Sequence, residues 1–297
     1  MKKGIFLASI IGLCLSSCTK DKDQPDAYGT FEATEVTVSS QSNGKIVWLK
    51  LEEGQMLDSG AVVGVVDTVD LNLKKSQTRE QQTATSARKE DLETQIAVQE
   101  QNKANVLIEK ARVERLLKDG AATRKQLDDI TASLNLIDKQ IVSINSQNSS
   151  LNAQVSTFDK QVAQLDKSVR DSRIINPIRG TVLTKYAEAN EITTFGKPIY
   201  KIADLSVLYL RVYLSGVQLP KIKIGQNVEV RFDKDETTND KTGGTVTWIS
   251  QTAEFTPKTI QTKEERVNLV YAVKVRVKND GRLKIGMPGE IKFLTEK

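Results

Sequence analysis

Two long stretches without glycine or proline dominate the chain, over residues 71–119 and 123–173. The break between them holds only Gly120, Ala121 and Ala122, after which the helix-forming pattern resumes at once. Glycine and proline are the residues that most strongly interrupt helices. Each stretch is therefore predicted to form one helix of about 50 residues, which at about 1.5 Å rise per residue is about 75 Å long.

The apolar residues of the second stretch follow a heptad repeat, with spacings that alternate between three and four residues. Its thirteen positions are Leu127, Ile130, Leu134, Ile137, Ile141, Ile144, Asn148, Leu151, Val155, Phe158, Val162, Leu165 and Val169. The first stretch has a weaker version at Leu92, Ile96, Gln99, Lys103, Val106, Lys110, Val113 and Leu117. Such a repeat is typical of a coiled coil. Residues 74–89 are almost entirely polar, and we expect weaker packing there.

The short break predicts how the two helices meet. Two helices of equal length joined by about four residues must run antiparallel, so that each seam covers the other. Thr123 and Gln126 have the spacing of a capping box, which starts a helix, and Gly120 is the residue type that commonly ends one. Asn148 is expected to fix the register of the seam at some cost in stability.

The composition argues against an enzyme. The chain of 297 residues is only 5% aromatic and contains no histidine, which is the commonest general base and metal ligand. No paired-carboxylate, nucleophile-elbow or phosphate-loop pattern takes its place. The net charge of +5, without interleaved aromatic and basic residues, is not that of a nucleic-acid-binding protein. We therefore expect no catalytic residues, cofactor, metal site or nucleic-acid partner.

The first 18 residues resemble an export signal. Lys2 and Lys3 precede an apolar run over residues 5–15, which is shorter than the about 20 residues that span a bilayer. The run leads into Leu-Ser-Ser-Cys18, which resembles the lipobox of bacterial lipoproteins. The resemblance implies cleavage before Cys18 and a lipid on its side chain, with residues 19–26 as a flexible tether. The alternative is a plain secretory signal with an incidental cysteine.

A short internal repeat flanks the helical stretches. Both copies combine short β-forming runs with turn residues at offsets of ten and sixteen from the first glycine. These residues are Gly44, Gly54 and Gly60 in the first copy, and Gly180, Asn190 and Gly196 in the second. Each copy has too few strands to bury a face alone, so the two are predicted to interleave into one small β-sandwich. The glycines are expected to form turns, and the hairpin to be an insertion between the two copies.

The order of these modules resembles that of the HlyD-like membrane fusion proteins, or periplasmic adaptors, as do residues 175–182, 202–206, 224–230 and 285–291. The resemblance implies an α+β multi-module fold. A long antiparallel coiled-coil hairpin is inserted in a split biotinyl/lipoyl-like β-sandwich, and a small antiparallel β-barrel follows. The expected parts are a signal peptide (1–17), tether and first barrel strand (18–38), half-motif 1 (39–70), hairpin (71–173, tip about 118–123), half-motif 2 (174–204) and barrel (205–297).

The same resemblance implies an adaptor of a tripartite efflux or secretion system, which joins an inner-membrane exporter to a TolC-like outer-membrane channel. In that family the hairpin tip docks onto the channel through an arginine, a leucine and a serine. The matching positions here are Arg112, Leu116 and Thr123, with threonine replacing serine. The resemblance further implies a ring of identical subunits, commonly six. It also implies a periplasmic location, with the lipid of Cys18 in a membrane, the inner membrane being favoured.

The exporter is expected to be of the ABC type. Residues 255–262 and 269–273 resemble the branch that serves such exporters, the anchor is a lipid, and the chain ends soon after residue 289. The alternatives are an adaptor for an RND or MFS pump, or a periplasmic coiled-coil scaffold or chaperone without a transport role. A lipoyl-type transfer domain is disfavoured, because the coiled coil occupies the place of the modified lysine.

Overall fold

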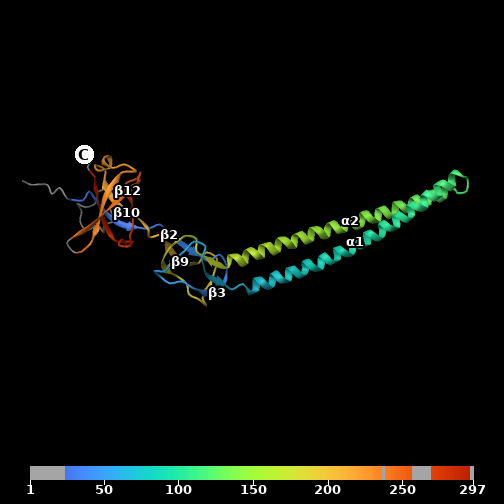
Figure 1. The fold of residues 1–297 in the computed structure, drawn as a ribbon, viewed down its shortest axis with the longest axis horizontal. Coiled ribbons are helices and arrows are strands. Elements are labelled where there is room, and N and C mark those ends of the chain that lie inside the picture. Colours follow the sequence, from blue (N-terminus) through green and yellow to red (C-terminus); the bar gives the residue numbers. More distant parts are fainter. Residues whose placement is uncertain (1–23, 236–237, 256–268, 295–297) are drawn as a thin grey trace, which may run out of the picture.

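The computed structural model describes residues 24–235, 238–255 and 269–294. Three modules lie in a row along the long axis of the molecule: a β-barrel, a β-sandwich and a helical hairpin (Figure 1). The chain passes through barrel and sandwich on its way to the hairpin tip and again on its way back. Both ends of the described chain therefore lie at the barrel, opposite the tip. No helix in the described ranges is long and apolar enough to cross a membrane.

The hairpin consists of α1 (Val69–Lys118) and α2 (Arg124–Asp171), which run antiparallel as predicted. α1 is continuous through residues 74–89, and its less exposed side chains keep the alternating spacing there. These are Leu71, Lys75, Thr78, Gln82, Thr85 and Lys89. Among the described side chains of the two helices, only Val113 and Asn148 are buried. A rod of two helices leaves the flanks of nearly every seam residue open to water.

Polar pairs between the helices set one register along the rod. They are Lys75 with Asp166, Gln82 with Asp159 at 2.6 Å, and Lys103 with Asp138 at 2.7 Å. In each pair the two residue numbers add up to 241. Asn148 Oδ1 instead accepts a hydrogen bond from Asn152 Nδ2 of its own helix at 3.1 Å. The cross-helix pairs and the tight turn thus hold the register, and the role predicted for Asn148 stays a prediction.

The sandwich contains two four-stranded sheets, ordered β2-β9-β7-β4 and β6-β5-β3-β8. Its strands are β2 (Glu35–Ser39), β3 (Gly44–Leu49), β4 (Met56–Leu57), β5 (Val62–Val66), β6 (Arg173–Ile175), β7 (Gly180–Lys185), β8 (Ile192–Thr193) and β9 (Pro198–Ala203). β2 starts at Glu35 and pairs with β9. The boundary expected between residues 38 and 39 is therefore corrected, because β2 is a strand of the sandwich.

The two copies of the repeat exchange strands. Each residue of the first copy corresponds to the residue 136 positions later in the second copy. Leu57 of the first copy pairs with Gly180 of the second, and their equivalents Thr193 and Gly44 pair in the same way. The predicted interleaving is therefore confirmed. Gly44 has a φ of +145°, as expected of a turn glycine. Gly180 is needed for another reason: a Cβ there would lie 2.5 Å from the carbonyl oxygen of Ala203 on the neighbouring strand.

A closed antiparallel barrel forms the third module. Its strands are β1 (Ala27–Glu32), β10 (Val207–Ser215), β11 (Asn227–Asp233), β12 (Asn239–Ile249), β14 (Leu269–Lys278) and β15 (Pro288–Phe293). They follow the order β10-β1-β15-β11-β12-β14, and pairing of β10 with β14 closes the ring. The two-residue edge strand β13 (Glu254–Phe255) pairs with β14, and a short helix η1 (Leu219–Lys221) follows β10. The N-terminal strand thus completes a barrel whose other strands come after the hairpin.

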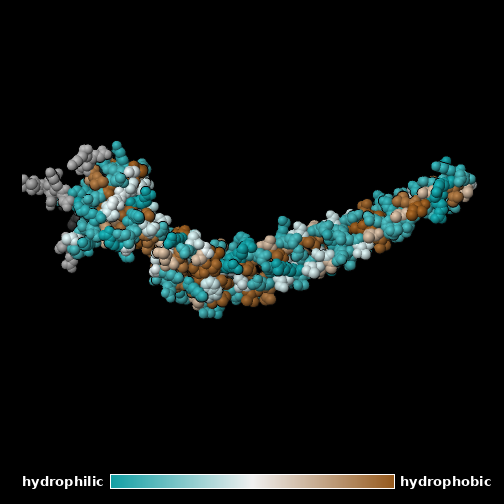
Figure 2. Space-filling view, in the orientation of Figure 1, coloured by the Kyte–Doolittle hydropathy of each residue, from teal (hydrophilic) through white to brown (hydrophobic). Residues whose placement is uncertain are grey.

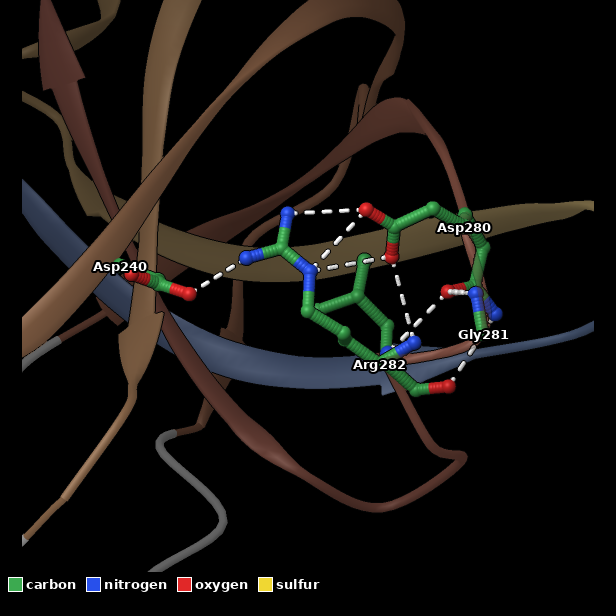
Figure 3. Close-up of polar contacts among 6 residues, drawn as sticks. Asp240, Asp280, Gly281 and Arg282 are labelled. Carbon is green, nitrogen blue, oxygen red and sulfur yellow. Dashed lines mark hydrogen bonds and ion pairs between the residues drawn. The ribbon is translucent and has the colours of Figure 1, made fainter.

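The loop between β14 and β15 braces the junction of barrel and sandwich. Asn279 Nδ2 donates to the carbonyl oxygen of Leu205 at 2.9 Å, within the connection from β9 to β10. Beside it, the guanidinium of Arg282 contacts Asp280 of the same loop and Asp240 of β12 (Figure 3). The hydrogen bond from Arg282 is the main cause of the lowered pKa of Asp280. The barrel end that faces the sandwich therefore carries a compact, paired set of charges.

Candidate docking site at the hairpin tip

The tip turn is built from backbone hydrogen bonds at the end of α1. Gly120 has a φ of +74°. Its N–H donates to the carbonyl oxygen of Leu117 at 3.2 Å, and the N–H of Ala121 donates to that of Leu116 at 2.8 Å. This pair of bonds is the Schellman motif, which favours glycine at its left-handed position. Gly120 is thus required by the turn itself.

Thr123 begins α2 as its N-cap, and the predicted capping box is confirmed. The N–H of Thr123 donates to Gln126 Oε1 at 2.8 Å, and the N–H of Gln126 donates to Thr123 Oγ1 at 3.3 Å. The hydroxyl of Thr123 also donates to Gln126 Oε1 at 3.1 Å. Capping therefore accounts for a hydroxyl residue here, and a docking partner would meet a side chain that is already hydrogen-bonded.

Arg112 and Leu116 lie one turn apart on the outside of α1, next to the seam residues Val113 and Leu117. The Arg112 side chain is 60% exposed, and its Nη2 lies 3.0 Å from Glu109 Oε2. Leu116 is 39% exposed. Because an exposed pair within one helix contributes only about 0.3–0.5 kcal/mol, a partner carboxylate could replace Glu109 at little cost.

Two further cations lie just beyond the turn. Arg124 and Lys125 occupy the first turn of α2, which contains no acidic residue. Both are exposed, and neither forms an ion pair within the described residues. The helix dipole disfavours positive charge at this end, so an acidic partner surface would relieve an unfavourable arrangement. The tip is therefore suited to a partner that carries carboxylates near an apolar contact.

The distal half of the hairpin also exposes apolar side chains that the seam does not use (Figure 2). They are Val98, Leu107, Ile108, Leu136 and Val142. The heptad pattern does not include them, because it covers only the positions that face the partner helix. Apolar residues outside those positions were the signal that could have identified them.

The structure does not test the other predicted site, because Cys18 lies outside the described residues. A cavity of about 620 Å³ lies between the base of the hairpin and the sandwich, with Ser42, Lys45, Asp67 and Asp171 among its lining residues. The described residues contain no cluster of three or more metal-ligating side chains. The tip is therefore the strongest candidate site that the described structure presents.

No family model matches the sequence. Among known proteins, the chain is 32% identical over 129 residues to a "UPF0194 membrane protein" of Yersinia pseudotuberculosis serotype O:3, covering 42% of this chain and 38% of the relative. A similarly named protein of Acidithiobacillus ferridurans is 34% identical over 119 residues, or 40% of this chain and 35% of the relative. The matches thus span well under half the length of these relatives.

Solved structures share the fold over most of the chain. MacA from Actinobacillus actinomycetemcomitans has a TM-score of 0.57 at 20% identity, covering 89% of this chain and 76% of that one. The membrane fusion protein Spr0693 from Streptococcus pneumoniae R6 has a TM-score of 0.58 at 14% identity, covering 89% of this chain and 99% of that one. Together with the observed modules, these matches confirm the predicted hairpin, sandwich and barrel.

Proposed function

We propose that this protein is a periplasmic adaptor that joins an inner-membrane exporter to a TolC-like outer-membrane channel. One observation carries the proposal: the described chain begins at the barrel, with β1, at one end of the molecule, and the hairpin tip lies at the other (Figure 1). α1 alone, with 50 residues, adds about 75 Å of reach. A lipid on Cys18 would hold the barrel end at the membrane, so the tip would meet a partner far from that surface.

The names of similar proteins support this reading. The matched relatives are described as membrane proteins, and Spr0693 as a membrane fusion protein. The pump in our proposal is an ABC exporter, because the lipid anchor and residues 255–262 and 269–273 resemble that branch of adaptors. Cross-linking in cells, followed by identification of the captured membrane proteins, tests this choice. Recovery of an RND or MFS pump would replace the ABC assignment, and absence of any transporter would favour a scaffold or chaperone.

A single hairpin encloses no conduit, so the proposed adaptor acts as a ring of identical subunits, six in our proposal. The exposed apolar residues of the distal hairpin, such as Leu107 and Leu136, are available for contacts between neighbouring hairpins. Native mass spectrometry in the presence of the exporter should show the oligomer. A strict monomer under those conditions would contradict the ring.

Docking at the tip can be tested by the double substitution Arg112→Asp with Leu116→Ser. It should abolish export and channel association while the fold and the membrane fraction remain unchanged, since both side chains are exposed and outside the seam. The matched control is Lys74→Asp with Leu73→Ser, a chemically similar exposed pair at the base of the same helix. If the tip variant exports as well as the control, the tip is not the docking site.

Lipidation is tested separately. Cys18→Ala should give an unprocessed or soluble product, whereas the wild-type chain should partition into detergent and carry an acylated N-terminal cysteine by mass spectrometry. Processed but unacylated protein from wild-type cells would show that residues 1–17 are a plain secretory signal.

A further inference from the structure

One end of the barrel collects exposed apolar side chains. Because neighbouring barrel strands are antiparallel, the start of β1, the end of β10, and the starts of β11 and β14 all lie at the end away from the sandwich. The end of β15 lies there too. The residues at this end that form what we call the barrel-end patch are Tyr28, Val217, Lys221, Lys223, Ile224, Leu269 and Leu294.

The loop that carries Val217 is held by side-chain hydrogen bonds of its neighbour Gln218. Val217 is 82% exposed, yet the adjoining Gln218 is fixed by three hydrogen bonds. Gln218 Oε1 accepts from the N–H and the hydroxyl of Ser215 at 3.0 and 2.8 Å, and its Nε2 donates to the carbonyl oxygen of Asp26 at 2.6 Å. The loop that carries Val217 is therefore attached to the segment through which the N-terminal part of the chain enters the barrel.

Ile224 is presented by a tight turn. The N–H of Gln226 donates to the carbonyl oxygen of Lys223 at 3.1 Å, and Gly225 has a φ of +88°. This geometry is a type II turn with Ile224 at its second position, where it is 65% exposed. Such a corner does not require an isoleucine, so the turn geometry leaves the exposed apolar side chain unexplained.

The charges of the patch differ from those at the opposite end of the same barrel. Lys221 and Lys223 are exposed and form no ion pair within the described residues. At the sandwich end, Arg282 is paired with two carboxylates (Figure 3). Exposed aliphatic side chains beside unpaired lysines are typical of surfaces that lie in the headgroup region of a membrane. Exposed Tyr28 and Trp248, which lies next to last in β12, fit the preference of Tyr and Trp for the same region.

We infer that the barrel-end patch lies against the lipid headgroups of the membrane that holds the anchor, with Lys221 and Lys223 at anionic lipids. This inference rests on the lipid anchor proposed at Cys18. Cys18 and Ala27 are nine positions apart and can be separated by at most about 32 Å when the chain is fully extended, so the anchor keeps this end near the membrane. The contact would set the rod upright and direct the hairpin tip away from the surface.

A protein partner is the competing occupant of this surface. Val217 and Ile224 are among the most exposed large apolar side chains of the described residues, and neither lines the cavity at the base of the hairpin. Single protruding aliphatic side chains insert readily between lipids, whereas a protein interface is usually anchored by side chains in well-packed pockets. Together with the tether, these features favour the lipid surface.

The test uses the full chain in protein-free vesicles of phosphatidylethanolamine and phosphatidylglycerol. A polarity-sensitive fluorophore is attached to Val217→Cys, to Ile224→Cys, or to the control Ile285→Cys at the sandwich end of the barrel. The two patch positions should become brighter and blue-shifted and should be quenched by lipid-borne quenchers, while the control should not respond. Equal responses at both ends, or a response at Val217 and Ile224 only after a transporter is added, would overturn the inference.

Charge gives a second readout. Each lysine near an anionic surface contributes about fivefold to binding, so Lys221→Gln with Lys223→Gln should weaken the contact roughly thirtyfold on anionic vesicles. On neutral phosphatidylcholine vesicles the change should be small. Vesicle flotation of the same samples reports the anchor independently. Protein that floats without a response at Val217 would refute the patch and leave the lipid at Cys18 intact.

Discussion

The polar seam of α1 permits a quantitative prediction at Lys103. This residue occupies a seam position, where its ammonium lies 2.7 Å from Asp138 of α2, and the two side chains are 39% and 42% exposed. We predict that Lys103→Leu stabilises the distal hairpin slightly, although it removes one of the three described polar pairs that cross between the helices.

The magnitude follows from two opposing effects. An exposed ion pair of this kind contributes about 0.2–1 kcal/mol, which the substitution removes. A leucine in the same place would bury somewhat more than half of its side chain, which is worth about 1–2 kcal/mol. The net gain is smaller than this, because the methylene stem of the lysine already buries part of the same apolar area. Asp138 remains partly exposed and keeps its hydration. The expected net change is about 0.5 kcal/mol in favour of the folded hairpin.

Hydrogen exchange of the α1 amides measures this change, because it reports local opening without unfolding the barrel. The expected stabilisation of about 0.5 kcal/mol should slow exchange near residue 103 about twofold in Lys103→Leu, because about 0.59 kcal/mol corresponds to a factor of e in rate. Lys103→Ala should instead accelerate exchange at the same amides. The reasoning would be refuted if Lys103→Leu opened the hairpin more than Lys103→Ala does. In that case the ion pair would be the dominant interaction at this level of the rod.

Three further predictions concern other parts of the fold. Thr123→Ala should cost about 0.5–1 kcal/mol by hydrogen exchange of the tip, because the bond lost from Gln126 N–H is long, whereas Thr123→Asp should retain the cap. Gly180→Ala should lower the thermal midpoint of the sandwich, with a cost of about 1–3 kcal/mol, since its Cβ would clash with the backbone of Ala203. The hydrogen bond from Lys75 is the main cause of the lowered pKa of Asp166. The stability that this pair contributes is therefore present above pH 3.8, the ordinary pKa of the carboxyl group, and is lost as the pH falls below that value. Exchange at the hairpin base should rise in that range, and less so in Asp166→Asn.

The hairpin was predictable because its determinants are local and periodic. Helix formation depends on neighbours three and four residues away, and the seam repeats every seven, so α2 could be identified from Leu127 to Val169 without a structure. The turn was predictable for the same reason, since Gly120 and Thr123 act on backbone groups within a few residues. The residues proposed for docking were identified by family resemblance, and their role awaits experiment.

The sandwich was predictable as a unit but not in its pairing. The repeat showed that two equivalent halves must combine, whereas the exchange of β4 onto β7 and of β8 onto β3 joins residues more than 120 positions apart. Such pairings depend on how the intervening hairpin returns the chain, which no local pattern records. The start of the sandwich at Glu35 was missed for this reason, because β2 is defined by its partner β9.

The sequence by itself determined the two helices and their turn, whose stabilising contacts lie within one or two helical turns, and it marked the repeated strands through their turn residues. Tertiary structure alone decided which carboxylate of α2 faces each polar seam residue of α1, as with Lys103 and Asp138. It also brought β1 across the chain to close the barrel and placed Val217 beside the entering N-terminal segment. These outcomes depend on the relative position of segments far apart in sequence, and that position is set only when the modules pack.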